Sequence, residues 1–202
     1  MSTEQGFLVL ADISGFTAFV TRMELEHGAE VTGALLETVM EHLSPPLEIQ
    51  ELEGDAVFAI GADHVTAGEG VPAAAAQAFA AFKERRLAIS LDDSCGCRAC
   101  RGVATLSLKL VVHHGRFVRQ TVGGRSRVAG PDVILAHRLL KNNVAGDTYL
   151  LLTASAMEHA GVDPFAAGMR PYVATYPHLG EVSCFVTDLD AAPPVLAGAY
   201  AA

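Results

Sequence analysis

The sequence predicts an α+β domain in which helices cover one mixed, mostly antiparallel β-sheet. Short apolar runs of strand length alternate with longer segments whose apolar residues recur at helical spacing. The helical segments interrupt pairs of strands that have the pattern of hairpins, as is typical of helices packed on one sheet. Of the 202 residues, 50% are hydrophobic and 18% are charged, so we expect a buried core rather than a disordered chain.

The first strand is predicted at residues 7–11, a continuous apolar run bounded by glycines. Residues 17–43 then carry apolar side chains at helical spacing. His27 and Gly28 are a candidate break between two helices, and the two prolines after Ser44 end the second helix.

The remaining elements follow the same patterns. In order, they are strands at 47–52 and 56–60 around a turn at 53–55, a helix at 71–89, a polar loop at 92–102, a hairpin of strands at 106–113 and 117–122, a flexible connection at 123–127, a helix at 132–140, a strand at 149–152, a helix at 154–160 and a strand at 182–188. We expect one domain over residues 1–190 and a flexible, Ala- and Pro-rich tail over 191–202.

The charge and the apolar pattern exclude some classes of protein. A net charge of -9 argues against a nonspecific nucleic-acid binder, because such proteins present an excess of Lys and Arg to phosphates. No apolar run approaches the length that spans a membrane, and the first residues lack the pattern of a signal peptide. The expected location is therefore the cytoplasm.

Two carboxylates are placed to meet at one edge of the sheet. Asp12 follows a buried strand, and Asp55 follows the Gly54 turn. Neighbouring carboxylates repel each other unless a proton or cation lies between them, and Mg²⁺ is typically held by one or two carboxylates together with substrate phosphates. The loop from Ser14 to Thr17 leads into a helix whose first N–H groups could bind those phosphates. The alternative is that both residues are ordinary cap and turn aspartates.

A cysteine loop is the second candidate site. Cys95, Cys97 and Cys100 lie within six residues, which in a reducing compartment favours a metal over disulfides. Zinc is the expected ion, but structural zinc takes four ligands and the loop supplies three. The candidates for the fourth are Cys184, His113, His114 and a residue of a partner subunit. Free thiols or a disulfide within the loop are the alternatives.

Four segments, in order, resemble the class III adenylate/guanylate (nucleotidyl) cyclase superfamily. They are residues 10–17 (LADISGFT), 51–55 (ELEGD), 112–115 (VHHG) and 130–139 (GPDVILAHRL). The cysteine loop and the stretch from Gly123 to Asn142 also resemble an uncharacterised bacterial branch of that superfamily. The resemblance implies a ferredoxin-like cyclase catalytic-domain fold that extends over nearly the whole chain.

The resemblance also implies the roles of several residues. Asp12, the carbonyl of Ile13 and Asp55 would hold two divalent ions, Mg or Mn, and Arg138 would stabilise charge on the phosphate. Gly15, Phe16 and Thr17 would contact the nucleotide. A nucleoside triphosphate ligand and a head-to-tail homodimer are implied as well, because cyclase sites are shared between two subunits.

The sequence departs from the family at the positions that orient the ribose and select the base. Ile134 stands in place of an asparagine that binds the ribose, and Pro131 in place of a base-selecting aspartate that the adjacent Asp132 could partly replace. Glu51 stands where adenylyl cyclases have lysine and guanylyl cyclases have glutamate. The family's late phosphate-binding lysine has no match at 176–180. Each lost group costs roughly 2–4 kcal/mol in the transition state, so ordinary cyclase turnover is not expected.

Three functions therefore compete. The leading one is a cyclase-like signalling protein that binds a nucleoside triphosphate with a divalent metal and whose catalysis is lost or altered. The second is an active guanylyl-type cyclase or another phosphoryl-transfer enzyme, and the third is a non-catalytic interaction dimer stapled by zinc. His137 is expected to point away from Arg138, and Arg125 and Arg127 to be solvated loop charges.

Overall fold

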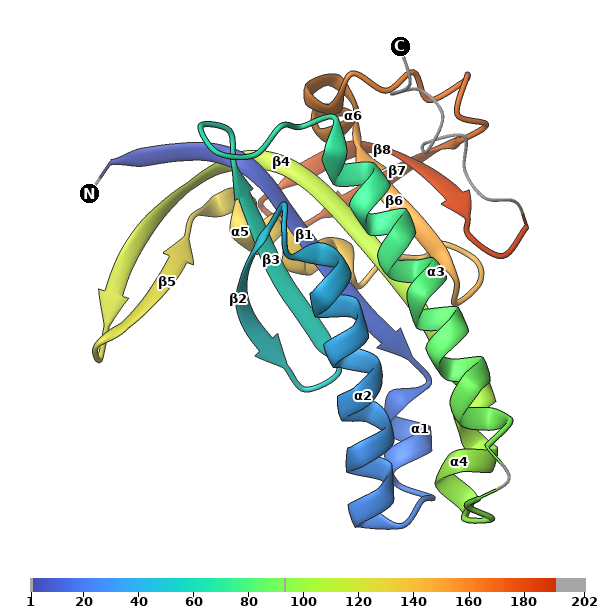
Figure 1. Cartoon of the computed structure of the whole chain (residues 1–202). Coiled ribbons are helices and arrows are strands. Elements are labelled where there is room, and N and C mark those ends of the chain that lie inside the picture. The colour runs from blue at the N-terminus through green and yellow to red at the C-terminus, as the bar shows by residue number, and fades with distance from the viewer. Residues whose placement is uncertain (1, 93, 192–202) are drawn as a thin grey trace.

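One eight-stranded sheet organises the chain in the computed structural model, which describes residues 2–92 and 94–191 (Figure 1). The strands are β1 (Thr3–Ser14), β2 (Glu48–Glu53), β3 (Ala56–Ala62), β4 (Ser107–Val122), β5 (Arg125–Ala129), β6 (Tyr149–Thr153), β7 (Arg170–Tyr176) and β8 (Gly180–Asp188). Their order is β2-β3-β1-β4-β6-β8-β7, and β5 pairs with β4 beside this path. Only the β4–β6 pair among these is parallel.

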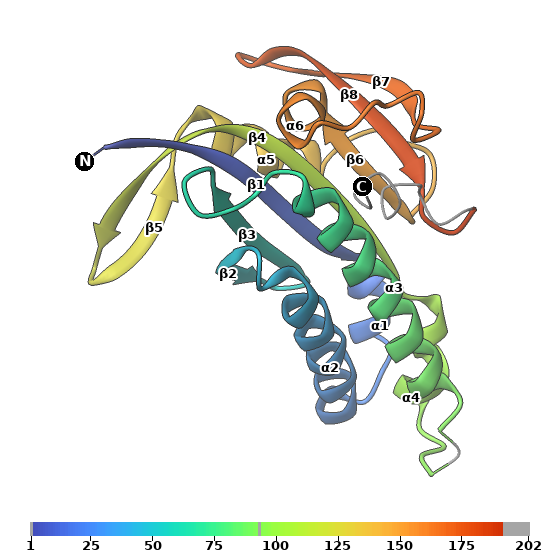
Figure 2. The same cartoon turned by 45° about the horizontal axis from the view of Figure 1, so that its top comes forward.

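Helices cover both faces of this sheet, which confirms the predicted α+β class (Figures 1 and 2). They are α1 (Phe16–Val20), α2 (Leu25–Leu43), α3 (Gly70–Ser90), α4 (Arg98–Gly102), the 3-10 turn η1 (Val103–Thr105), α5 (Pro131–Leu139) and α6 (Ala154–Ala160). None of the helices in the described part of the chain is long and apolar enough to cross a membrane. The predicted tail lies outside the described residues from 192 onward.

Strand β1 is buried on both faces. Its successive side chains point to opposite sides of the sheet, and each side is covered by helices. Phe7 and Val9 pack into the core beneath α2 and α3, whereas Leu8 and Leu10 pack beneath α5. Figure 2 shows α2 and α3 together on one side of the sheet and α5 on the other. The continuous apolar run at 7–11 follows from this double burial.

The predicted hairpin at 106–122 is wrong, because β4 is one strand of 16 residues. Gly115 does not turn the chain, since it is paired with Gly6 in the β1–β4 ladder. A Cβ atom at Gly6 would lie 2.2 Å from the carbonyl oxygen of Gly61, so this glycine is needed for close backbone approach. The real turn is at Gly123 and Gly124, both at positive φ, and residues 125–129 form β5 rather than a flexible connection.

Two other details differ from the prediction. The break in the first helical segment falls between Val20 and Leu25, so His27 and Gly28 lie inside α2. The hydroxyl of Thr21 donates to the carbonyl of Thr17 at 2.8 Å, and such a bond competes with continuation of a helix. Strand β7, which alternates exposed and partly buried residues, was not predicted.

Candidate functional site

The pairing of β1 with β3 brings Asp12 and Asp55 to the same place. Asp12 lies opposite Ala56 in the ladder, and the N–H of Ile13 donates to the carbonyl of Asp55 at 3.1 Å. The turn between β2 and β3 is made by Gly54, whose φ of 68° suits glycine. Strand pairing therefore explains why two carboxylates 43 positions apart share one sheet edge.

A lysine that the sequence analysis missed completes this group. Lys109 lies opposite Asp12 in the β1–β4 ladder, and its Nζ is 2.8 Å from Oδ2 of Asp12. The two side chains are 23% and 18% exposed, so the ion pair is largely shielded from water. Burial by itself would lower the pKa of Lys109, but the hydrogen bond and charge of Asp12 outweigh burial and raise that pKa. Lys109 therefore stays charged.

Asp55 is the less compensated of the two carboxylates. Burial raises its pKa, and the negative charge of Asp12 raises it further. Repulsion between neighbouring carboxylates is relieved by a cation, and a pair of carboxylates suits a hard divalent ion. Asp12 and Asp55 are therefore a donor pair of the kind that can hold Mg²⁺ or Mn²⁺.

A cleft of about 530 Å³ adjoins this group. It is lined by Asp12, Glu53, Ala56, Lys109, His137, Arg138, Leu140 and Lys141. Three of these residues carry a permanent positive charge and two carry a carboxylate. The lining can therefore balance the charge of an anionic ligand beside the carboxylates.

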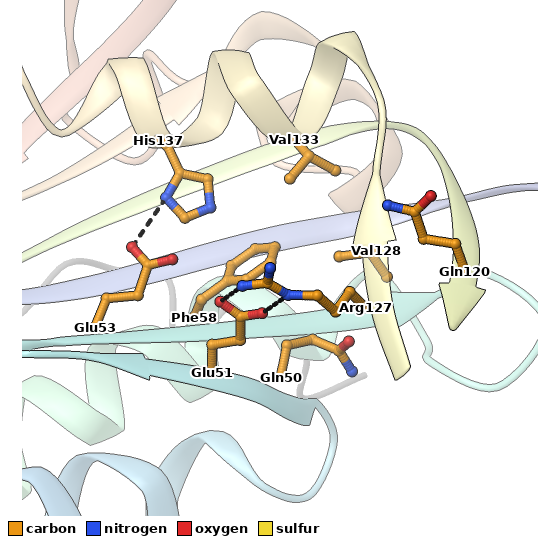
Figure 3. Close-up of a pocket in the computed structure, with 9 residues that line it drawn as sticks. All are labelled: Gln50, Glu51, Glu53, Phe58, Gln120, Arg127, Val128, Val133 and His137. Atoms are coloured by element: carbon orange, nitrogen blue, oxygen red, sulfur yellow. Dashed lines mark hydrogen bonds and ion pairs between the residues drawn. The ribbon is translucent and has the colours of Figure 1, made fainter. Parts of the chain in front are cut away.

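The last turn of α5 provides both Arg138 and His137 to this cleft. The expectation that His137 points away is wrong, because the cleft spans the end of the helix and borders two successive positions. Nδ1 of His137 lies 3.5 Å from Oε2 of Glu53, and its ring packs edge-on against Phe58 (Figure 3).

The Gly15 turn follows the carboxylate group directly. Gly15 has a φ of 85° and precedes α1, which begins at Phe16 and contains Thr17. This helix has only five residues, so its dipole is small compared with that of a long helix. Gly15 and Thr17 are exposed and Phe16 is half-buried. The turn itself is packed, since a Cβ at Gly15 would lie 3.2 Å from the carbonyl oxygen of Thr105.

Glu51 is held by an arginine on a neighbouring strand. Nε and Nη2 of Arg127 lie 2.7 and 3.1 Å from the two carboxylate oxygens of Glu51 (Figure 3). This bidentate hydrogen bond lowers the pKa of Glu51. The expectation that Arg127 is a solvated loop charge is wrong, because β5 places it over Glu51. The pair lies in a neighbouring pocket of about 170 Å³ that shares Glu53 and His137 with the cleft.

Asp132 lies at the end of α5 opposite to Arg138. Its Oδ2 accepts the backbone N–H of Arg116 at 2.7 Å, and its Oδ1 lies 3.6 Å from Nε2 of His113. Six helical residues separate it from Arg138, which corresponds to about 9 Å along the axis. Ile134 is four residues before Arg138, so the two share a helix face, and its side chain is exposed.

The three loop cysteines converge on a histidine from α2. One ligand atom from each of His27, Cys95, Cys97 and Cys100 lies within 4.8 Å of the others, so this cysteine centre could hold a metal ion. Nδ1 of His27 is 3.0 Å from Sγ of Cys97 and 3.5 Å from Sγ of Cys95. The residue was missed because it is 68 positions before Cys95 and the sequence gives no signal of their contact.

The three candidates for a fourth ligand within this chain all lie elsewhere. Nδ1 of His113 is 3.0 Å from the hydroxyl of Thr153, and Nε2 of His114 is 3.1 Å from the Asp63 carboxylate. Cys184 is buried in β8.

The thiols of the cysteine centre are not equivalent. The backbone N–H of Cys100 donates to Sγ of Cys97 at 3.3 Å; this bond, with the nearby His27 ring, lowers the pKa of Cys97 to about 6. Burial raises the pKa of the Cys100 thiol to about 12. The contact with Cys97 also raises the pKa of His27. Cys97 is therefore the more readily ionised of these two thiols.

The described residues have the fold of class III nucleotidyl cyclase catalytic domains. The guanylyl cyclase Cya2 superposes with a TM-score of 0.77 at 14% identity, over 92% of each chain. The guanylate cyclase domain of RhGC from Catenaria anguillulae, solved in complex with GTP, gives 0.65 at 15% identity, over 93% of this chain and 99% of that one. At such identities the likeness establishes the fold, which the resemblance predicted.

Sequence comparison identifies the family within this fold. Residues 32–149 match the family described as a protein of unknown function, DUF2652, and the chain belongs to that family. The uncharacterized protein Rv2561/Rv2562 of Mycobacterium tuberculosis is 37% identical over 122 residues, which is 59% of this chain. The match spans 55% of that relative's length.

Proposed function

We propose that this chain is a cyclase-like signalling module that binds a nucleoside triphosphate with Mg²⁺ or Mn²⁺ and whose catalysis is lost or altered. The observation that carries the proposal is a cleft lined by Asp12, Lys109 and Arg138, with Asp55 next to Asp12 through the pairing of β1 with β3. A divalent ion held by Asp12, Asp55 and the Ile13 carbonyl would supply charge neutralisation at the phosphates. The neighbouring Gly15 turn, with Phe16 and Thr17, is the proposed nucleotide-binding loop.

The positive side chains of the cleft support phosphate binding. Arg138 is the proposed transition-state arginine, and its guanidinium suits bidentate contact with phosphate oxygens. Lys109 is half-buried and paired with Asp12, so its charge is fixed beside the two carboxylates proposed to hold the metal. It offers a positive charge to the cleft, whereas the family's late phosphate-binding lysine has no match at 176–180.

Loss or alteration of catalysis is supported by the groups around the base and the ribose. Ile134 cannot hydrogen-bond a ribose, and Glu51 is already paired with Arg127 in both of its oxygens. Asp132 is engaged with the Arg116 amide. A guanine base that hydrogen-bonds to Glu51 would first have to displace the guanidinium of Arg127.

The proposal includes a head-to-tail homodimer and a cytoplasmic setting. The β4–β5 hairpin extends beyond the sheet (Figure 1), and Val122 near its tip is 55% exposed. Leu52 on β2 is 53% exposed and lines one pocket together with Val122. Exposed apolar side chains of this kind are common at subunit contacts. In the cytoplasm the loop cysteines stay reduced, and thiolate ligands favour zinc as the ion of the cysteine centre.

Calorimetric titration tests the nucleotide proposal. GTP and ATP are titrated into the full chain with Mn²⁺, beside Asp55→Asn and a matched control, Asp163→Asn, in the exposed loop before β7. We expect metal-dependent binding that Asp55→Asn weakens at least ~10-fold and that the control preserves. No binding of either nucleotide to the wild type would rule the proposal out.

A chromatographic turnover assay with the same proteins separates the remaining functions. Absence of cyclic product together with nucleotide binding supports a binding module. Cyclic product that disappears in Asp55→Asn would instead establish an active enzyme. Absence of both binding and product would leave the non-catalytic interaction dimer.

A further inference from the structure

The cysteine centre has close to the geometry of a closed zinc site. Tetrahedral zinc, with bonds of ~2.3 Å to sulfur and ~2.0 Å to nitrogen, holds adjacent ligand atoms about 3.5–3.8 Å apart. Here the four ligand atoms lie within 4.8 Å of one another, and the closest of the His27 contacts is 3.0 Å. Side-chain shifts below about 1 Å therefore convert the cluster into a tetrahedron, and no fourth ligand from a partner subunit is needed.

The surroundings of His27 suit a metal ligand rather than a surface histidine. Its Nδ1 faces the thiols, while its Nε2 lies 3.3 Å from Oε2 of Glu30, one turn further along α2. Histidines that bind metals commonly donate their second ring N–H to a carboxylate, which fixes the ring and its tautomer. Glu30 is placed to do this.

We propose that His27, Cys95, Cys97 and Cys100 bind one structural zinc ion that ties the start of α2 to the segment 95–105 and thereby supports the Gly15 turn of the cleft. The support of the cleft rests on the proposed nucleotide function. The zinc ion itself does not.

The contacts of the segment 95–105 show how the support works. In Figure 1, α1, α4 and the start of α2 gather at one end of the molecule, away from the β4–β5 hairpin. Beside the centre, Glu24 at the N-cap of α2 accepts from Nε of Arg98 at 3.1 Å and from the backbone N–H of Ala99 at 3.3 Å. The ion pair is exposed and is worth little in water. Zinc would add direct bonds to His27 in α2 and to the cysteines of the segment 95–105.

From the centre, packed residues lead to the Gly15 turn. Ala99 and Val103 are fully buried, and Gly102 has Met23 so close that a Cβ would lie 2.6 Å from its Cε. The segment ends at Thr105, whose carbonyl oxygen borders Gly15. Loosening the segment therefore loosens one wall of the turn that follows Asp12.

Metal analysis of the purified full chain tests the zinc ion directly. We expect about one zinc per chain, and competition with a chromophoric chelator should show at least ~100-fold weaker binding in His27→Ala. His42→Ala is the matched control, an exposed histidine further along the same helix. Glu30→Gln should weaken zinc binding by roughly 10-fold if Glu30 orients the ring. Unchanged zinc affinity in His27→Ala would overturn the assignment of this ligand.

Cobalt substitution provides a measurement that does not depend on a variant that folds. Co²⁺ added to metal-free wild type should give tetrahedral d–d bands and a thiolate charge-transfer band. Thiol counting covers the alternatives: no bound metal, with free thiols or a disulfide among the three loop cysteines, would overturn the proposal.

Nucleotide titration with and without zinc tests the support of the cleft. We expect chelation of zinc to weaken nucleotide binding at least ~5-fold and zinc return to restore it, which is within the usual range of coupling between sites. Equal affinity in both forms would overturn the support while leaving the zinc ion. Zinc binding without any nucleotide binding would remove the proposed function and not the zinc centre.

Discussion

The cleft and the cysteine centre both collect charged groups, but they compensate them differently. In the cleft, a lysine of the protein neutralises Asp12, and the two groups come from adjacent strands of the sheet. In the cysteine centre, three thiols meet one histidine. The thiols come from α4 and the loop before it, and the histidine comes from the first turn of α2. The cleft can therefore keep its shape without a metal, whereas the proposed zinc ion would hold the cysteine centre together.

The difference also separates function from stability. A metal in the cleft would be held by rigid strands and exchanged with the ligand, as suits a binding site. A metal in the cysteine centre would have four protein ligands and no open position, which is typical of structural zinc. Each of the following predictions perturbs one side of this comparison.

Removal of metal from the cysteine centre should have the largest effect on stability. A chelator that strips zinc should reduce the free energy of unfolding by roughly 3 kcal/mol, because a ligand that binds only the folded state stabilises it. For a chain of this size the melting temperature should fall by roughly 6–12 °C. Differential scanning fluorimetry before and after zinc return measures the change; an identical melting curve in both states would contradict the prediction.

Loss of the internal cation of the cleft should have the next largest effect. Lys109→Met leaves Asp12 shielded and unpaired, at an expected cost of about 1–3 kcal/mol in urea denaturation. The double variant with Asp12→Asn should recover part of this loss, because it removes the charge that was left alone. Mg²⁺ should stabilise Lys109→Met more than the wild type. Absence of a Mg²⁺ response in both proteins would contradict the binding of a divalent ion at Asp12.

His113, a buried histidine of β4, should make a smaller, pH-dependent contribution to stability. Burial lowers the pKa of His113, so the folded state keeps this ring neutral while the unfolded chain takes up a proton near pH 6.5. Stability should therefore be complete above that pH and fall as the pH drops below it, by at most about 1.4 kcal/mol per pH unit. Melting curves between pH 7.5 and about 5 should show this slope, and His113→Gln should reduce it.

The Glu51–Arg127 pair should matter least for stability. Both side chains are partly exposed, and such pairs contribute little to folding. Glu51→Gln should leave the melting temperature nearly unchanged and alter the preference between GTP and ATP in calorimetry. An unchanged preference would exclude Glu51 from base recognition, and Glu181→Gln, an exposed position on β8, is the control.

The sequence predicted those features of the fold that local patterns specify. The buried run at 7–11, the turn at Gly54 and the helix that carries Arg138 were all evident in it. The hairpin in β4 was predicted wrongly because Gly115 suggested a turn, whereas it is a site of close packing where a Cβ would lie 2.6 Å from Asp132. Local pattern does not distinguish these two uses of glycine.

The candidate sites were predictable only in part for a related reason. Asp12 and Asp55 were found because each follows a recognisable strand or turn. Lys109 and His27 were missed because their partners are set by strand register and helix packing over long separations. The sequence does give one hint for Lys109, which is a charged residue inside the otherwise apolar run 108–112.

The length of β4 connects two regions that would otherwise be independent. This strand of 16 residues contains both Lys109 beside the cleft and Val122 at the tip of the β4–β5 hairpin, roughly 43 Å apart along the strand. Pairing with β1 holds β4 from Ser107 to Val118, and pairing with β5 holds its outer end. A molecule that binds the β4–β5 hairpin would therefore contact the same strand that positions Lys109 in the cleft.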